Sequence, residues 1–294
     1  MIRDRIFSLM DQDEDSNTRR LKIYAYQTIF LVLLVSENWS VALLYWEEWG
    51  AAHKLVVYVS SALALASLRI RWRKNVFIGL AFLQLFMHWE SFPLTGNHKY
   101  LQTIICGLLA ILDPESDDEA QLFHRAACWL LFLVLFYSGL QKLVHGYYFE
   151  GQFLAFSLWR RTFLPFHQFM QVILPAEEFT RLASYGRAPG AGPYLVSNPV
   201  FLFVSNSVYI GEIGLALMLL VRRTRRFAIV GIFGLVFAIE AVARELYFGQ
   251  LFFATVLLYA RADVIRKIVP WVFGVNLFLI LMRLGIIPLL FEFS

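Results

Sequence analysis

A long apolar run that ends close to a charged residue constrains this chain more than any other feature. Residues Trp129 to Leu140 carry no charged side chain, and Lys142 follows two positions later. An α-helix needs about 20 mainly apolar residues to cross a bilayer, and the wider segment Leu122–Val144 has that length. A lysine at the end of such a helix extends to the membrane surface, pairs with an acid, or takes part in chemistry. The run predicts a membrane helix and leaves these three roles of Lys142 open.

The composition of the whole chain agrees with that interpretation. Of its 294 residues, 59% are hydrophobic and only 16% are charged, whereas soluble domains average about 25% charged residues. The net charge of +4 requires no nucleic-acid partner, because most of the excess lies in short loops, where it sets membrane topology. Both cysteines, Cys106 and Cys128, lie in apolar runs, so neither a disulfide framework nor a zinc site is indicated. The sequence predicts an integral membrane protein.

Nine segments are apolar enough to be candidate membrane helices, although the fourth and the eighth are short. They are Ile23–Tyr45, Leu55–Leu68, Val76–Trp89, Tyr100–Leu112, Leu122–Val144, Phe201–Val221, Phe227–Val242, Phe248–Tyr259 and Ile268–Leu290. We therefore expect an all-α, polytopic membrane bundle of about nine transmembrane helices. Residues 1–22 are expected to form a cytoplasmic N-terminal segment, and residues 23–290 the transmembrane domain.

Basic residues between these segments predict how the bundle is oriented, because cytoplasmic loops are enriched in Lys and Arg. The basic stretches are residues 19–22, 69–74, 222–226 and 261–267, and all four fall on one side when nine segments are counted. The N-terminus is therefore expected in the cytoplasm and the C-terminus outside. The membrane would be the plasma membrane or, for a bacterial chain, the inner membrane. The long connection 146–199 falls outside, and we expect an interfacial helix followed by a Pro/Gly-rich loop there.

Polar residues inside and beside the candidate helices share one depth. All of them lie at or outside the bilayer midplane under the predicted topology; they are Glu37, Asn38, Gln84, His88, Asn97, His98, Lys142, His145, Asn206, Glu212, Glu240 and Arg244. Ionisable groups in hydrocarbon normally face a cavity or one another. This one-sided distribution predicts a pocket open to the outer side. It disfavours a solute carrier, which places polar groups at mid-depth beside broken helices.

Each of these residues also has a simpler interpretation. Lys142 lies near a helix C-terminus, where the helix dipole favours cations, and His98 could cap the helix that follows it. Glu240 and Arg244 are spaced as an i,i+4 pair, and Glu212 could be a neutral acid bonded to a neighbouring helix. The histidines lack the tight His/Glu spacing of metal ligands, so no metal site is predicted. The residues alone leave these alternatives open.

Two short motifs are expected on the outer side of the bundle. They are Asn97-His98-Lys99-Tyr100-Leu101 and Gly139-Leu140-Gln141-Lys142-Leu143, the second followed by Glu150-Gly151. They resemble the Asn-His-x-Tyr-Leu segment and the Gly-x-x-Lys-Leu and Trp-x-Glu-Gly run of the vitamin K-dependent γ-glutamyl carboxylases. A looser match to the same family is Gln250-Leu251-Phe252. The broader group is the horizontally transferred transmembrane (HTTM) domain family, and the resemblance covers roughly residues 20 to 270.

The resemblance implies a membrane enzyme that acts on a quinol. Lys142 would be the catalytic base that deprotonates reduced vitamin K or another, menaquinol-like quinol, and His98 would orient that lysine. The quinol-binding residues would be Asn97, Glu240, His88 and Tyr137. In this family, quinol epoxidation by O2 is coupled to the capture of CO2 by glutamate, which gives γ-carboxyglutamate. The implied class is therefore a lyase or quinol monooxygenase, and burial would favour the neutral amine that a lysine base needs.

Three departures from the family pattern qualify these expectations. The family's histidine on the seventh span falls on Glu240, and the spacing from Lys142 to Glu150-Gly151 is one residue longer. The chain stops at Ser294, without the large extracytoplasmic domain that holds the substrate in the animal enzymes. An exported peptide or protein substrate would then be presented by the long outer connection or by a separate chain. The alternative function is that of a non-redox accessory factor for the maturation of, or immunity to, an exported peptide.

Overall fold

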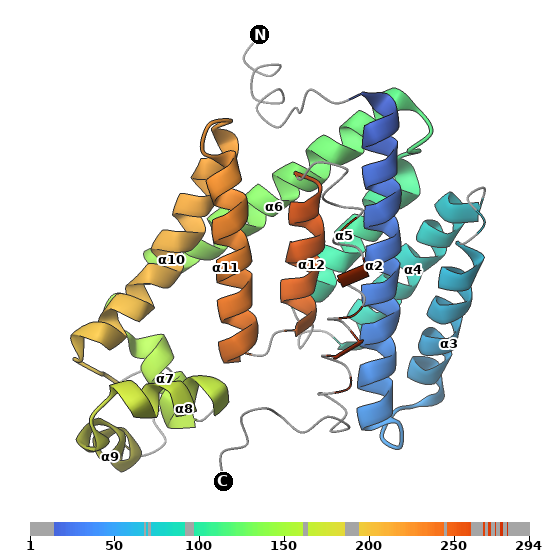
Figure 1. Ribbon diagram of the computed structural model, residues 1–294. Helices are drawn as coiled ribbons and strands as arrows, with labels where there is room; N and C mark the ends of the chain where they lie inside the picture. Colours follow the sequence, from blue (N-terminus) through green and yellow to red (C-terminus); the bar gives the residue numbers. More distant parts are fainter. Residues whose placement is uncertain are drawn as a thin grey trace. The chain divides into compact units, whose positions relative to one another are not determined.

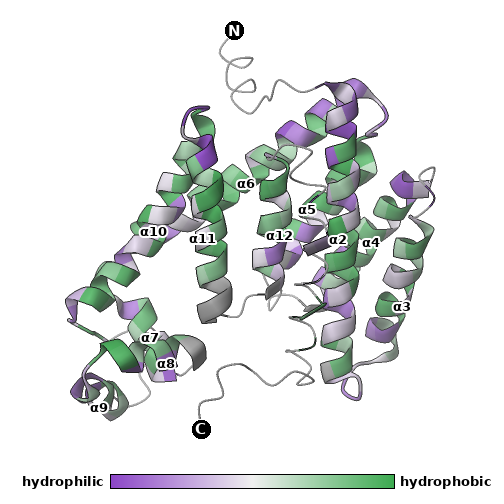
Figure 2. Ribbon diagram, in the orientation of Figure 1, coloured by the Kyte–Doolittle hydropathy of each residue, from purple (hydrophilic) through white to green (hydrophobic). Residues whose placement is uncertain are grey.

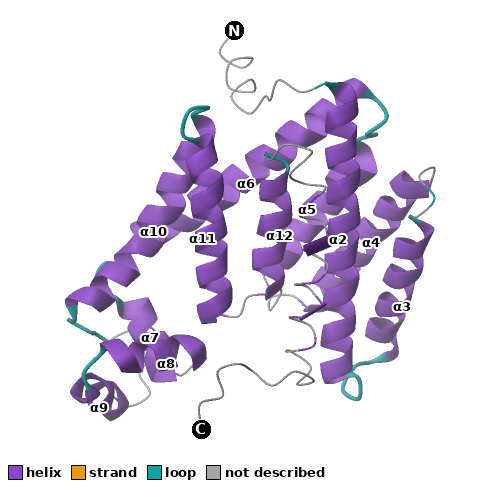
Figure 3. Cartoon of the chain, in the orientation of Figure 1, coloured by secondary structure: helices purple, strands orange, loops and turns teal. Residues whose placement is uncertain are grey.

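The computed structural model describes residues 15–67, 69, 72–91, 97–160, 164–185, 194–243 and 246–259, with isolated positions between 267 and 281 (Figure 1). Every regular element in these ranges is helical (Figure 3). The α-helices are α2 (Ser16–Tyr45), α3 (Ala51–Ala66), α4 (Arg73–Ser91), α5 (Asn97–Ile111), α6 (Asp117–His145), α7 (Gln152–Arg160), α8 (Leu164–Ile173), α9 (Ala176–Ser184), α10 (Pro199–Leu220), α11 (Arg225–Ala243) and α12 (Leu246–Leu257). The predicted all-α fold class is confirmed for this part of the chain.

Each of the first eight apolar segments predicted from the sequence coincides with one helix to within five residues at either end, except that α2 begins seven residues before the first segment. Helices α2 to α6 correspond to the first five, and α10, α11 and α12 to the next three. The ninth segment, Ile268–Leu290, lies outside the described residues except for isolated positions. Three helices, α2 as far as Leu43, α6 and α10, are long and apolar enough to cross a membrane. The other spans and the side of each terminus stay predictions.

The chain divides into two compact units, which are described separately. Unit one contains Trp129–Glu245, grouped with Met1–Leu9, and unit two contains Met10–Cys128 with Leu246–Ser294. Helix α6 contributes its first part to unit two and its last part to unit one. Hydrophobic residues dominate the helices of both units, and hydrophilic residues gather at turns such as the one between α10 and α11 (Figure 2).

A row of aromatic rings forms the core of unit two. Tyr26 of α2 lies with its ring centroid 6.2 Å from that of Phe30 and 5.8 Å from that of Phe123 in α6. Phe30 continues the row to Phe77 of α4, at 6.4 Å. Helix α2 also packs against α3 and α12, while α4 packs against α3 and α5. These contacts fix the register of α2 against its neighbours, and that register aligns the polar residues of unit two.

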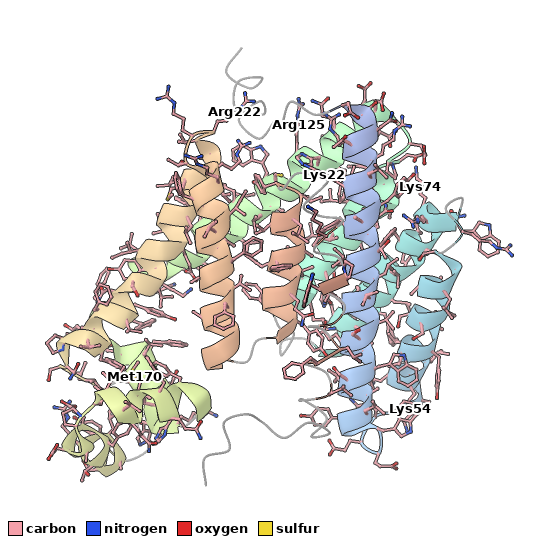
Figure 4. The ribbon with its side chains drawn as sticks, in the orientation of Figure 1. Lys22, Lys54, Lys74, Arg125, Met170 and Arg222 are labelled. Carbon is pink, nitrogen blue, oxygen red and sulfur yellow. The ribbon has the colours of Figure 1, made fainter. Side chains whose placement is uncertain are left out.

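Basic side chains mark one end of unit two. Arg20, near the start of α2, forms an ion pair with Asp117 at the start of α6, with 2.7 Å between the charged atoms. Figure 4 labels Lys22, Lys74 and Arg125 toward this end, and Lys54 at the opposite end. The two helices therefore begin at the same end of the unit, where these basic side chains lie beside the acidic start of α6.

The long connection 146–199 forms three short helices, α7, α8 and α9, rather than a single helix and a loop. They enclose an apolar core of Ala155, Leu158, Phe166, Met170, Leu174, Leu182, Tyr194, Val196 and Phe201. The indole of Trp159 lies 4.7 Å from the ring of Tyr194 and donates a hydrogen bond to the carbonyl of Tyr185 at 3.2 Å. This α7–α9 subdomain packs through α8 against α11. The Pro/Gly-rich stretch 187–193 predicted as a loop lies outside the described residues.

Candidate functional site

Lys142, the residue that the sequence singled out, forms a buried ion pair in unit one. Its Nζ atom lies 2.6 Å from Oε1 and 2.7 Å from Oε2 of Glu212, and it donates a third hydrogen bond to Oγ of Ser138 at 2.8 Å. The Glu212 side chain is 7% exposed and that of Lys142 is 21% exposed. An ammonium group has three N–H donors, and here all three have an acceptor. Of the three roles open to Lys142, the structure shows pairing with an acid.

A glycine brings the two helices of this ion pair together. Gly139 of α6 lies against α10, and a Cβ atom at this position would be 2.7 Å from Cγ1 of Ile213 and 3.0 Å from the carbonyl oxygen of Tyr209. Both distances are too short for a side chain, so the close approach of α6 and α10 requires glycine there. Lys142 follows three residues later and meets Glu212 near the middle of α10. The Gly-x-x-Lys spacing thus has a structural reason in this chain.

The turn after α6 is fastened to α10 beside the ion pair. Gly146 and Gly151 both have positive φ, 71° and 69°, a conformation that glycine adopts without steric cost. Ser205 of α10 donates a hydrogen bond to the carbonyl of Tyr148 at 2.7 Å, and Asn206 donates one to the carbonyl of Phe149 at 3.1 Å. The ring of Tyr148 is thereby held with its centroid 5.7 Å from Nζ of Lys142. Lys142 lies between an acid and an aromatic ring.

Unit two contains a second buried ion pair, between Glu37 of α2 and Lys99 of α5. Their charged atoms are 2.9 Å apart, and the Glu37 side chain is 3% exposed. The other carboxylate oxygen of Glu37 accepts a hydrogen bond from Nε2 of Gln102 at 2.6 Å. Lys99 occupies the variable position of the Asn-His-x-Tyr-Leu motif, for which the resemblance implies no role. Both ion pairs could have been predicted from the sequence, because charged residues inside apolar helices normally face one another.

His88, predicted at the quinol site, also belongs to unit two. Its Nε2 atom lies 2.7 Å from Oγ1 of Thr103, whose hydroxyl donates to the carbonyl of Lys99 at 2.9 Å. Since that hydroxyl has a single hydrogen, Nε2 of His88 must be the donor to it. The imidazole also lies 4.6 Å from the ring of Tyr100. These contacts join α4 to α5 and leave Nδ1 of a neutral His88 as an acceptor.

The remaining predicted site residues are distributed over both units. Asn97 and His98 form the first residues of α5 in unit two, and Glu240 lies in the last part of α11 in unit one; their side chains are outside the described part of the chain. Tyr137 of unit one is 58% exposed, with its ring edge-on to that of Phe136. Because Lys142 and His98 belong to different units, their proposed partnership stays a prediction.

The described part of the chain therefore defines an all-helical protein with three helices that could cross a membrane and a buried ion pair in each unit. Within the ranges that the structure describes, no group of three His, Cys, Asp or Glu side chains is arranged to hold a metal ion. Comparison with known protein families, characterised proteins and solved structures found no match for the chain.

Proposed function

We propose that the chain is a multi-pass membrane enzyme that uses Lys142 as a base on a quinol, as its resemblance to the vitamin K-dependent γ-glutamyl carboxylases implies. The observation that carries the proposal is the pair of Lys142 and Glu212, a lysine and a proton acceptor joined by two short hydrogen bonds between apolar helices. The proposal includes about nine spans, a cytoplasmic N-terminus and an outer C-terminus. The basic end of unit two supports that orientation, because basic residues gather on the cytoplasmic side.

Lys142 and Glu212 have two protonation states: a charged ion pair, and a neutral pair in which Lys142 can act as a base. As an ammonium group with three acceptors, Lys142 cannot take up a proton. Transfer of one proton from Nζ to Glu212 gives a neutral amine beside a neutral carboxylic acid, and burial favours neutral groups over charged ones. The amine then accepts a proton from a quinol hydroxyl and becomes an ammonium group again. Glu212 later releases its own proton to water, so Glu212 is the residue that makes Lys142 a base.

The surroundings of Lys142 suit a ring that carries a hydroxyl group. The aromatic face of Tyr148 and the hydroxyl of Ser138 lie beside Nζ, so a planar ring would meet an aromatic wall and a polar contact together. When bound, the quinol would be oxidised by O2. That oxidation would drive the removal of a proton from glutamate before CO2 is captured. His98 would orient Lys142, with Asn97, Glu240, His88 and Tyr137 around the quinol. The glutamate would belong to an exported peptide or protein, presented by the α7–α9 subdomain or by a separate chain.

The proposal is tested by replacing Lys142 and measuring quinol turnover by the full chain in lipid nanodiscs. Lys142→Arg keeps a cation that can pair with both oxygens of Glu212, but a guanidinium does not lose its proton in proteins. We expect Lys142→Arg to fold and to lose quinol oxidation or epoxidation, and Lys142→Ala to lose it as well. Mass spectrometry of the lipid that co-purifies with each protein would identify the quinone.

Two outcomes would contradict the proposal. Turnover by Lys142→Arg at the wild-type rate would exclude Lys142 as the base. No turnover of any quinol by the wild-type protein, with no quinone in the purified material, would favour the alternative of a non-redox accessory factor for an exported peptide. Lys54→Arg is a matched control, because the ammonium group of Lys54, in unit two, lies over the ring of Trp46 at 4.9 Å, and arginine keeps that cation–aromatic contact.

A further inference from the structure

Unit two aligns a set of glutamine side chains at the level of Glu37. Helices α2 and α4 run parallel with a constant offset: Arg73 donates to Oε1 of Gln27 at 3.0 Å, and the ring of Phe77 lies 6.4 Å from that of Phe30. In these contacts the α4 residue comes 46 or 47 positions after its α2 partner. Gln84 comes 47 positions after Glu37. The register therefore places Gln84 of α4 at the same height as Glu37 of α2.

Helix α12 adds a glutamine close to that height. It runs antiparallel to α2, since the Tyr247 hydroxyl bonds the Ser40 hydroxyl near the end of α2, while Thr255 lies 3.4 Å from the Tyr26 hydroxyl near its start. Gln250 comes one turn after Tyr247 and therefore lies within about one helical turn of Glu37 along the axis. Helix α12 packs against both α2 and α5. Four helices thus bring polar side chains together at one level of an otherwise apolar core.

The amides of these glutamines have hydrogen-bonding atoms without partners. Within the described part of the chain, the buried atoms that lack a partner include Oε1 of Gln84, Oε1 of Gln102 and both amide atoms of Gln250. Gln84 is 3% exposed and Gln102 is 2% exposed. Buried polar atoms are almost always hydrogen-bonded, because an unpaired one forfeits its interaction with water. We name Gln84, Gln102 and Gln250 the amide cluster.

The chemistry of the amide cluster defines what it can hold. Gln102 donates through Nε2 to the Glu37 carboxylate, which fixes its Oε1 as an acceptor. The unpartnered atoms are then three amide oxygens and one amide nitrogen, so acceptors predominate. The charge of Glu37 is already balanced by Lys99 at 2.9 Å, and a further ion would enter without a counter-charge. A neutral molecule that donates hydrogen bonds fits this arrangement, whereas a metal cation or a carboxylate does not.

The residues around the amide cluster narrow the class of ligand. Leu80 of α4 and Ile105 of α5 lie about one turn from Gln84 and Gln102, and Leu34 of α2 lies about one turn from Glu37; all three are buried. A ligand there would have an apolar body with polar groups at separate points. We propose that the amide cluster is a binding site for a neutral, hydroxyl-bearing apolar molecule, such as an aromatic diol, whose hydroxyl groups donate to the amide oxygens of Gln84, Gln102 and Gln250. All three members of the amide cluster belong to unit two, and the proposal makes no use of Lys142.

The test compares two probes that share one ring, of which only the first can donate hydrogen bonds. Resorcinol has two hydroxyl groups on one ring and does not form a quinone, and 1,3-dimethoxybenzene has the same ring with no donor. Binding of each to the full chain in lipid nanodiscs is measured by saturation-transfer NMR and titration. We expect resorcinol to bind at least about tenfold more tightly, the effect of a net hydrogen bond or more. Equal binding of the two probes, or binding of neither, would overturn the proposal.

Matched variants locate the site. Gln84→Leu and Gln250→Leu each remove an unpartnered amide oxygen at nearly constant volume, so the unliganded proteins should unfold at the wild-type temperature or above. Each should bind resorcinol at least about tenfold more weakly. The control Gln121→Leu lies on α6, where Phe123 packs against Tyr26, about three helical turns from Glu37 along α2, and should bind like wild type. Wild-type affinity in both cluster variants would show that the glutamines are not the site.

Discussion

The two buried ion pairs in the described part of the chain are similarly buried, but they differ in whether all of their hydrogen-bonding atoms have partners. In unit one, both oxygens of Glu212 accept from Lys142, and the third donor of Lys142 is taken by Ser138. In unit two, Glu37 divides its oxygens between Lys99 and the amide of Gln102, and this leaves the amide oxygen of Gln102 without a partner. The first pair is a closed unit suited to moving a proton between its own members. The second is open and suited to receiving hydrogen bonds from outside.

The largest expected effect is on unit one, where removing one charge isolates the other. Glu212→Leu leaves the Lys142 ammonium in an apolar site, and breaking a buried pair in this way costs about 3–5 kcal/mol. The double variant Lys142→Met with Glu212→Leu should recover most of that loss, because an apolar pair of similar volume needs no counter-charge. Thermal unfolding in detergent micelles measures both. If the free energy of unfolding of Glu212→Leu lies within about 1 kcal/mol of the wild-type value, Lys142 and Glu212 do not depend on each other as a buried pair.

The next largest effect is expected at Gly139, whose contact with α10 positions the first ion pair. Gly139→Ala places a Cβ atom against the backbone of Tyr209 and the side chain of Ile213, which forces α6 and α10 apart at an expected cost of about 1–3 kcal/mol. Separation of the helices should also reduce quinol turnover. The control is Gly107→Ala on α5, where a Cβ would meet nothing within 4 Å and alanine is the better helix former. Equal stability of the two variants would contradict the close approach.

A smaller effect is expected from neutralising the open pair. Glu37→Gln retains an oxygen that can accept from the Gln102 amide, while the Lys99 ammonium, 21% exposed as a side chain, loses its counter-charge. We expect a loss of about 1.5 kcal/mol, the lower end of the range for a hydrogen bond to a charged group. The matched variant Glu212→Gln should cost more, since Lys142 has both oxygens of Glu212 as partners. Chemical unfolding measures both variants. A larger loss of unfolding free energy in Glu37→Gln than in Glu212→Gln would contradict this ranking.

The smallest effect concerns a carboxylate away from both pairs. Asp15 caps α2 by accepting the backbone N–H of Thr18 at 2.8 Å, and that hydrogen bond lowers the pKa of the Asp15 carboxyl below its usual 3.8. A lowered pKa in the folded state gives stability that is present above the unfolded value and is lost as the pH falls through the folded value. Hydrogen exchange at Thr18 should therefore quicken only below about pH 3.8. Asp15→Ala should show rapid exchange at every pH, and Asp15→Asn should retain most of the protection.

Hydrophobic periodicity and length predicted much of the fold, and single-residue reasoning predicted less of the site. The eight helices with apolar sequences were predicted because each is determined by its own residues. The presence of Glu37, Lys142 and Glu212 among the ionisable groups was also evident. Their partners were not, because Lys142 and Glu212 are 70 positions apart and meet only through the packing at Gly139. The helices α8 and α9 were missed because they are short and are stabilised by the shared core around Tyr194.

The core of the α7–α9 subdomain has a consequence for the order in which the protein can be made. Its residues Tyr194, Val196 and Phe201 are fully or almost fully buried in that core, yet they follow α9 in the chain, and Phe201 already belongs to α10. The subdomain therefore lacks part of its interior until the beginning of α10 has been synthesised. The bonds from Ser205 and Asn206 that hold the turn beside Lys142 come later still. The surroundings of Lys142 are thus assembled late, after α10 has emerged from the ribosome and packed against α6, where Lys142 precedes its partner Glu212 by 70 residues.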